Sequence, residues 1–244
     1  MNRQALTYAR YEVLRTFRNT RFFIFSLVFP VVLYLLIAGP NRHEKVSGIP
    51  LPLYFMTGMA AFGTMMAIVS TGGRIAAERQ VGWNRQLRLT PLRPSAYFSA
   101  KVLCGYGLAA VSILVLYALG IGFGVHLSAR AWLTMTGLIL VGLVPFAALG
   151  IAVGHLVSTD SMGPAMGGIT SLLALLGGVW GPIAEHGFLH DLSQAIPSYW
   201  LVQAGKVALE GHAWPMKGWV VIGIWSLVLG RVAAWSYRRD TARA

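Results

Sequence analysis

The stretch PLYFMTGMAAFGTMMAIVST at residues 52–71 is twenty residues long and contains no Asp, Glu, Lys or Arg. About 20 mainly apolar residues are enough for an α-helix to cross the hydrocarbon core of a bilayer. Similar stretches recur along the chain, and none has a charge near its middle, where one would cost about 2.5–3.5 kcal/mol. The six predicted spans are residues 21–39, 52–71, 97–125, 131–156, 162–183 and 216–236. We therefore expect an all-α membrane protein with six transmembrane helices in one domain, residues 1–244.

The composition also favours a membrane protein. Of the 244 residues, 56% are hydrophobic and only 11% are charged, whereas soluble domains carry about 25% charged residues. The net charge of +12 would suggest nucleic acid for a soluble protein. Here the basic residues lie in short loops and at the ends, where anionic cytoplasmic lipid attracts them. We therefore expect a lipid bilayer, and no nucleic acid, among the partners.

The positions of Lys and Arg predict the orientation. With both termini in the cytoplasm, the inner segments hold five of these residues in 3–21, five in 74–93, Lys101, and four in 231–243. The outer segments hold Arg42, Lys45, Arg130, Lys206 and Lys217. This three-to-one bias predicts cytoplasmic termini. Lys101 lies near the end of its span, and we expect its ammonium group to reach the interface by snorkelling.

Residues 1–21, which precede the first span, are expected to form an amphipathic helix in the membrane interface. One apolar stripe recurs at three- and four-residue spacing and consists of Leu6, Ala9, Val13 and Phe17. The charged residues Glu12, Arg15 and Arg18 lie away from this stripe. Such a pattern is typical of a helix that lies flat on a membrane, and the alternative is a simple basic leader.

The long basic loop at residues 72–95 is predicted to contain a short helix over residues 76–89, which lack proline and include one glycine. Thr90-Pro91 and Arg93-Pro94 would end it, because the residue before a proline avoids helical backbone angles. A basic helix that ends sharply in the cytoplasm suggests a docking element. The alternative is a solvated loop that only follows the charge bias.

Residues 184–215, on the predicted outer side, are too apolar for a free loop and too interrupted for a span. We expect short re-entrant helices that dip into the outer leaflet between the fifth and sixth spans. Glycine pairs within the spans would permit close helix packing. These pairs are Gly120/Gly124, Gly150/Gly154, Gly163/Gly167 and Gly177/Gly181.

The sequence contains no HExxH, GxSxG or GxxxxGK[ST] motif, so no catalytic residues and no phosphate-binding loop are predicted. His186 and His190 are four residues apart and would share a helix face, but no further ligand is evident, so we expect a polar cluster and no metal. The spans also lack the central charged residue that couples many carriers to an ion gradient. An energy source outside this chain is therefore expected.

The loop then shows a family resemblance. It reads Glu78-Arg79-Gln80-Val81-Gly82, then Leu87-Arg88-Leu89-Thr90-Pro91, with Lys101 beyond. This resembles the ER-x-x-G…L-x-x-TP…K stretch of ABC-2-type transporter permeases, the membrane subunits of bacterial ATP-driven exporters. The order of predicted segments resembles the plan of the family over nearly the whole chain, most of all daunorubicin-resistance-type drug exporters. Trp83, Asn84, Arg85, Arg88 and Leu89 depart from the usual family residues.

The resemblance implies a partner that supplies the energy. Two permeases, identical or homologous, would assemble with two ATP-binding subunits in a bacterial cytoplasmic membrane. The loop would be a coupling helix that sits in a cleft of the ATPase. ATP and magnesium would bind to that partner, so no cofactor is expected in this chain. The expected coupling residues are Glu78, Arg79, Gly82, Arg85, Leu87, Thr90 and Pro91.

The resemblance further implies export of an amphiphilic or hydrophobic substrate, such as a drug, an antibiotic or a lipid-like molecule. Methionine forms adaptable apolar surfaces, and the candidate substrate path is Met56, Met59, Phe62, Met65 and Met66. Ordinary helix packing is the alternative for these residues. Two other functions stay open, a non-transporting membrane scaffold or sensor and a membrane-embedded enzyme, although the spans lack polar catalytic groups.

Overall fold

The computed structural model describes residues 3–18, 20–46, 48–83, 86, 89–90, 94–183, 186–210 and 212–242. The helices are α1 (Arg3–Arg18), α2 (Thr20–Ala38), α3 (Leu51–Val69), α4 (Thr71–Gln80), α6 (Pro94–Gly122), α7 (Ala129–Gly142), α8 (Val144–Leu156), α9 (Thr159–Leu176), α10 (Phe188–Gln194), α11 (Pro197–Glu210) and α12 (Met216–Ala242). Two short antiparallel strands, β1 (Lys45–Val46) and β2 (Ile49–Pro50), precede α3. The architecture is thus helical, as the apolar stretches predict.

Helix α3 occupies the centre of the bundle. Every residue from Leu51 to Val69 is buried, and α3 packs against α2, α6, α8, α9 and α11. Ser70 keeps a helical backbone, with φ −57° and ψ −21°, so α3 continues into α4 and the two act as one rod over Leu51–Gln80. The second span therefore extends directly into the region predicted as a loop.

Four helices in the described part of the chain are long and apolar enough to cross a membrane: Leu51–Gln80, Pro94–Gly122, Ala129–Leu156 and Met216–Asp240. The fourth predicted span is divided into α7 and α8 at Leu143, two residues before Pro145. Helix α2 runs from Thr20 to Ala38, and its described side chains, from Leu27 onward, are mainly apolar. The first turns of α9 contain Asp160 and small residues. Six spans therefore stay a prediction.

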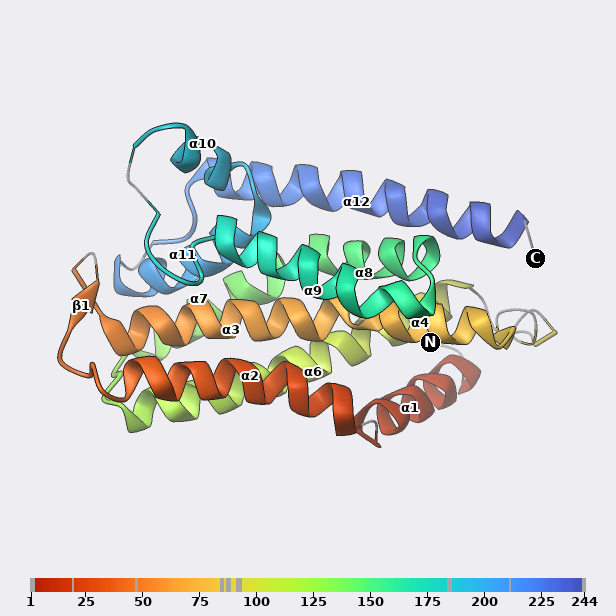
Figure 1. Cartoon of the computed structure of the whole chain (residues 1–244), viewed down its shortest axis with the longest axis horizontal. Helices are drawn as coiled ribbons and strands as arrows, with labels where there is room; N and C mark the ends of the chain where they lie inside the picture. Colours follow the sequence, from red (N-terminus) through yellow and green to blue (C-terminus); the bar gives the residue numbers. More distant parts are fainter. Residues whose placement is uncertain are drawn as a thin grey trace.

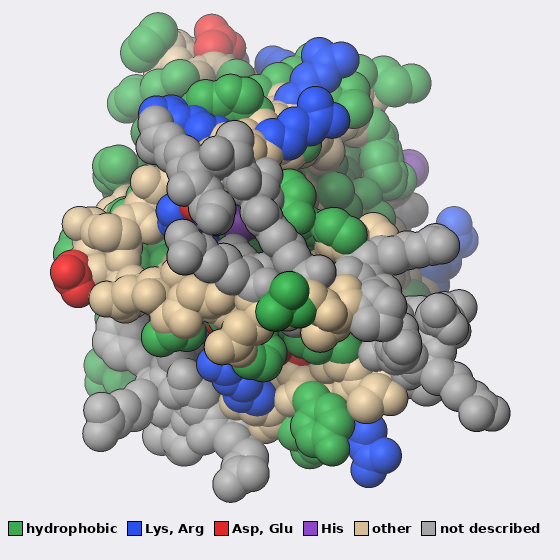
Figure 2. All heavy atoms as spheres, turned by 90° about the vertical axis from the view of Figure 1, so that its right-hand side faces the viewer, with side chains coloured by type: hydrophobic (Ala, Val, Ile, Leu, Met, Phe, Trp, Pro, Cys, Tyr) green, Lys and Arg blue, Asp and Glu red, His purple; other side chains and the backbone are tan. Residues whose placement is uncertain are grey.

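The two ends of the bundle differ in charge. In Figure 1 both termini, α1 and α4 lie toward one end, and β1, α10 and α11 lie toward the other. Figure 2, which views the first of these ends, shows Lys and Arg side chains at several places around it. Lys45 in β1 and Lys206 in α11 belong to the opposite end. The two groups of basic residues therefore lie at opposite ends, as the charge bias predicts.

The helix predicted over residues 76–89 is wrong in its boundaries, since it is interrupted after Gln80, although Trp83 and Gln86 beyond the interruption are again helical. Helix α4 begins five residues earlier and ends at Gln80. Gly82 then adopts a positive φ of 69°, and its N–H donates to the carbonyl of Arg79 at 3.0 Å. A glycine with this left-handed conformation is a common helix stop, and it acts here before the prolines do.

Two short helices, α10 and α11, form in the segment between α9 and α12, where the sequence predicted short helices. Phe188 and Leu189 on α10 are largely exposed. Exposed apolar residues also line α6, α7 and α12, for example Leu114, Leu133 and Leu227. We expect these side chains to contact lipid, because the exposure of apolar surface to water is unfavourable.

Candidate functional site

The end of the bundle that holds the termini contains a buried network of charged side chains around Glu78, near the end of α4. Glu78 is only 2% exposed. Its Oε1 accepts from Lys101 Nζ at 2.6 Å and from Arg15 Nη1 at 3.1 Å. Its Oε2 accepts from the hydroxyl of Tyr97 at 2.7 Å. One carboxylate therefore connects α4 to α1 and α6.

Lys101 lies at the centre of the same network and is completely buried. Its Nζ also donates to Glu12 Oε1 at 2.5 Å, so this ammonium group contacts two carboxylates. The expectation that Lys101 snorkels to the interface is therefore wrong. Two acids and two bases balance one another, which is how proteins accommodate buried charges that would otherwise cost several kcal/mol each.

The polar face of α1 packs on the protein. Tyr8, Glu12 and Arg15 recur at four- and three-residue spacing, which places them on one side of a helix. The rings of Tyr8 and Tyr97 are 6.0 Å apart. Burial, together with the carboxylates of Glu12 and Glu78, raises the pKa of the Tyr8 phenol, so it stays neutral. The charged residues of α1 thus anchor it to α4 and α6.

Arg79, the next residue along α4, makes a second set of contacts on a different side. Its Nη2 lies 2.8 Å from Asp240 Oδ1 on α12, and its Nη1 donates to the carbonyl of Gly154 on α8 at 3.0 Å. Asp240 Oδ2 also lies 3.1 Å from His155 Nδ1. Consecutive residues of α4 therefore bind two separate groups of helices, α1 and α6 through Glu78, and α8 and α12 through Arg79.

Glycines permit the close crossing of α4 and α8 that brings Arg79 to Gly154. A Cβ at Gly72 would lie 2.2 Å from the carbonyl oxygen of Gly150, and one at Gly154 would lie 2.6 Å from that of Gly72. Such distances exclude any side chain, so the two backbones are in direct contact. The Gly150/Gly154 pair therefore makes the contact within the chain, as GxxxG pairs do between membrane helices.

A family model described as ABC-2 type transporter matches residues 3–209. The chain belongs to this family. It is 31% identical over 192 residues to a protein of Bacillus subtilis (strain 168) named "Putative transport permease YvfS", and the match covers 77% of this chain and 78% of the relative. The family is one of transport permeases that work with an ABC ATP-binding partner, and the apolar helices indicate a multi-pass membrane protein.

The residues predicted to couple this ABC-2 permease to its ATPase fall into two groups. Glu78 and Arg79 bind inside the chain, so their side chains attach α4 to its neighbours. The side chain of Val81, just before the stop at Gly82, is exposed, and so are those of Leu89 and Thr90 beyond it. Arg85, Leu87 and Pro91 lie outside the described residues.

The predicted interfacial helix exists as α1, but only part of its stripe can be placed. Val13 is half-buried, and Arg15 is 63% exposed although its guanidinium bonds to Glu78. The side chains of Leu6, Phe17 and Arg18 lie outside the description. Contact of α1 with a membrane therefore stays a prediction.

The five residues of the candidate substrate path are all buried within the bundle: Met56, Met59, Phe62, Met65 and Met66. Met56 contacts α6, since a Cβ at Gly120 would lie 2.2 Å from its sulfur. Met66 Sδ accepts a hydrogen bond from Thr170 of α9 at 3.0 Å. In this arrangement they form the ordinary helix packing that the sequence left as an alternative, and their place in a substrate path stays a prediction.

His190, one of the two histidines considered for a metal, has its Nε2 2.6 Å from the side-chain nitrogen of Gln194. Among the described residues, no three His, Cys, Asp or Glu side chains are grouped so that they could hold a metal ion.

Sequence reasoning missed the partners Glu12, Tyr97, His155 and Asp240. One signal was present for the first of these. Glu12 is the only acid in residues 3–21, and Lys101 is the only charged residue of its predicted span. Because a lone charge in an apolar segment needs an opposite partner, this pair was open to inference.

Proposed function

We propose that this chain is the permease subunit of an ATP-driven exporter that moves an amphiphilic or hydrophobic substrate out of a bacterial cell. Membership of the ABC-2 type transporter family supports the transport role. Export and the substrate class rest on the resemblance to drug exporters. The protein would lie in the cytoplasmic membrane, cross it six times and pair with a second permease, identical or homologous.

The attachment of α4 is the observation that carries the coupling part of this proposal. Glu78 connects α4 to α1 and α6, and Arg79 connects it to α8 and α12. A force applied to the residues that follow Gly82 is therefore transmitted through α4 to both groups of helices. Residues 81–91 would dock into each of two ATP-binding subunits, which bind ATP and magnesium.

Co-purification with the cognate ATP-binding subunit, followed by ATPase assays in liposomes, tests this assignment. Glu78→Gln keeps the shape but weakens the bonds to Lys101 and Arg15, so we expect a complex that still forms but whose ATPase activity no longer responds to transport substrate. The matched control is Asp160→Asn, an exposed acid at the start of α9, which should behave as wild type. Full substrate stimulation in Glu78→Gln would show that α4 is not the coupling element.

Direction and cargo need a second assay. Inside-out vesicles that contain the complex should accumulate a fluorescent amphiphile from a compound panel when ATP is added. Accumulation only in right-side-out vesicles would indicate import, and no ATP-dependent movement of any compound would support the scaffold or sensor alternative.

A further inference from the structure

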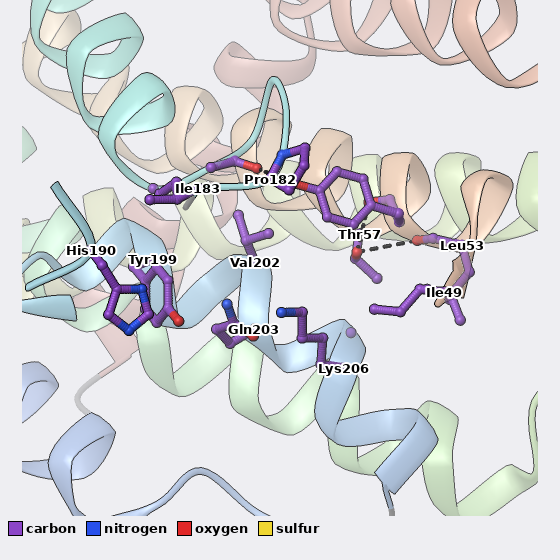
Figure 3. A pocket seen from close by; sticks show the side chains of 14 residues that line it. Ile49, Leu53, Thr57, Pro182, Ile183, His190, Tyr199, Val202, Gln203 and Lys206 are labelled. Atoms are coloured by element: carbon purple, nitrogen blue, oxygen red, sulfur yellow. Dashed lines mark hydrogen bonds between the residues drawn. The ribbon is translucent and has the colours of Figure 1, made fainter. Parts of the chain in front are cut away.

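A pocket lies at the end of the bundle opposite the charged network, between the start of α3, the loop after α9, and α11 (Figure 3). Its volume is about 630 Å³, including space open to solvent. The lining consists of Ile49, Leu53, Tyr54, Thr57, Gly177, Gly178, Pro182, Ile183, His190, Tyr199, Val202, Gln203, Gly205 and Lys206.

The walls of this pocket are held in place by direct contacts. The hydroxyl of Tyr54 donates to the carbonyl of Gly178 at 2.8 Å, which fixes the loop after α9 against α3. Gly178 has a φ of 77°, a conformation that side chains disfavour. A Cβ at Gly205 would lie 2.4 Å from Thr57, so α11 rests directly on α3. The pocket is therefore a formed feature of the fold.

The polar part of the lining is cationic. Tyr199, Gln203 and Lys206 follow one another at four- and three-residue spacing on α11, and Figure 3 shows them along one side of the pocket. Lys206 is half-buried, and in the described part of the chain no carboxylate or other acceptor bonds to its Nζ. None of the described residues that line the pocket is an acid. A partly desolvated ammonium group without a partner favours an anion, since charge-assisted hydrogen bonds are about twice as strong as neutral ones.

The rest of the lining is mainly apolar, with Tyr54, Thr57 and His190 as further polar side chains. The apolar lining includes Ile49, Leu53, Pro182 and Ile183 from other elements and Val202 from α11 itself (Figure 3). Burial of a hydrocarbon group against these side chains contributes about 0.8 kcal/mol for each CH₂. An inorganic ion would leave this surface unused.

We propose that this pocket binds an amphiphilic anion, a phosphate or carboxylate that carries an apolar chain, with the anionic group on Lys206 and the chain against Ile183 and Leu53. The ligand comes either from solution or from the anionic lipids of the bilayer, and both sources present the same chemistry. Binding at this site does not require that the protein transports a substrate.

The test uses the full chain in phosphatidylcholine nanodiscs. In the first arm, isothermal titration measures binding of hexyl phosphate, with empty nanodiscs subtracted and hexanol as the uncharged comparison. In the second arm, the nanodiscs contain phosphatidic acid, and native mass spectrometry measures the lipid that stays bound. The variants are Lys206→Gln, Lys206→Arg and Ile183→Trp, which fills the pocket without a change of charge. Arg130→Gln, an exposed basic residue at the start of α7, is the charge-matched control.

We expect saturable binding in at least one arm, and the arm identifies the source of the ligand. Lys206→Gln should weaken it about tenfold, the effect of losing a hydrogen bond to a charged group, while Lys206→Arg and Arg130→Gln retain it and Ile183→Trp abolishes it. The proposal is overturned if neither arm shows saturable binding, if Lys206→Gln binds as wild type does, or if hexanol binds as tightly as hexyl phosphate.

Discussion

The two ends of the bundle handle charge in opposite ways. At the end with the termini, Lys101 is completely buried between Glu12 and Glu78. At the other end, Lys206 is half-buried beside a pocket and has no partner in the described part of the chain. A lysine whose bonds are all made inside the chain joins helices, whereas a lysine without a partner is free to bind a ligand. The same residue type thus serves structure at one end and recognition at the other.

The strongest test of this contrast is Lys101→Met. It leaves the buried carboxylates of Glu12 and Glu78 without their shared cation, and losing one member of a buried ion pair costs about 3–5 kcal/mol. We expect the free energy of unfolding, measured by denaturant titration in mixed micelles, to fall by about that amount. Arg231→Met, which removes an exposed basic residue of α12, should change it by less than about 0.5 kcal/mol.

A triple variant sharpens the same point. Adding Glu12→Gln and Glu78→Gln to Lys101→Met removes the uncompensated charges, so a substantial part of the lost stability should return. A triple variant no more stable than Lys101→Met would mean that packing, and not charge, accounts for the loss.

The glycines that seat the helices allow a second comparison between the ends. Gly154→Ala forces its Cβ onto the backbone of Gly72, and we expect a loss of about 1–3 kcal/mol. Gly205→Ala meets the side chain of Thr57, which can adjust more readily than backbone, so its loss should be smaller. The reverse order in thermal unfolding would contradict this explanation.

Arg79→Gln tests the half of the network that faces α8 and α12. Because Arg79 and Asp240 are partly exposed, with side chains 27% and 20% accessible, the expected loss is only about 1–2 kcal/mol. Asp240→Asn should cost a similar amount. The double variant should cost less than the sum of the two, since both changes break one interaction; strict additivity in a double-mutant cycle would show that the pair is not coupled.

Lys206→Gln should have the smallest effect on stability, under about 0.5 kcal/mol, because no bond within the described residues is lost. A destabilisation as large as that of Lys101→Met would show that Lys206 is a structural residue. The two lysines would then have the same role, and the proposed difference between the two ends would be wrong.

Much of the fold follows from the sequence, because apolar runs and charge bias act along the chain. The helix predicted from the stretch at 52–71 agrees with α3 to within one or two residues at each end. The family predicted from the motif that contains Glu78 and Arg79 is the family that the comparison found. The contacts of these two residues did not follow, since Glu12, Lys101 and Asp240 are far apart in sequence. The predicted end of the helix over residues 76–89 was wrong because it was placed at Pro91 and Pro94, whereas Gly82 ends α4 earlier. The pocket depends on α9, α11 and β2 meeting α3, which no local pattern shows.

The rod formed by α3 and α4 joins the two ends mechanically. Its 30 residues over Leu51–Gln80 correspond to about 45 Å at 1.5 Å per residue. Leu53, Tyr54 and Thr57 line the pocket near its first turn, and Glu78 lies in its last. A tilt of about 5° around the midpoint would move each end by roughly 2 Å in opposite directions, which is enough to break a hydrogen bond. A ligand that displaces the first turn of this rod would therefore strain the hydrogen bonds of Glu78 at its other end. A displacement of Glu78 would in turn change the width of the pocket.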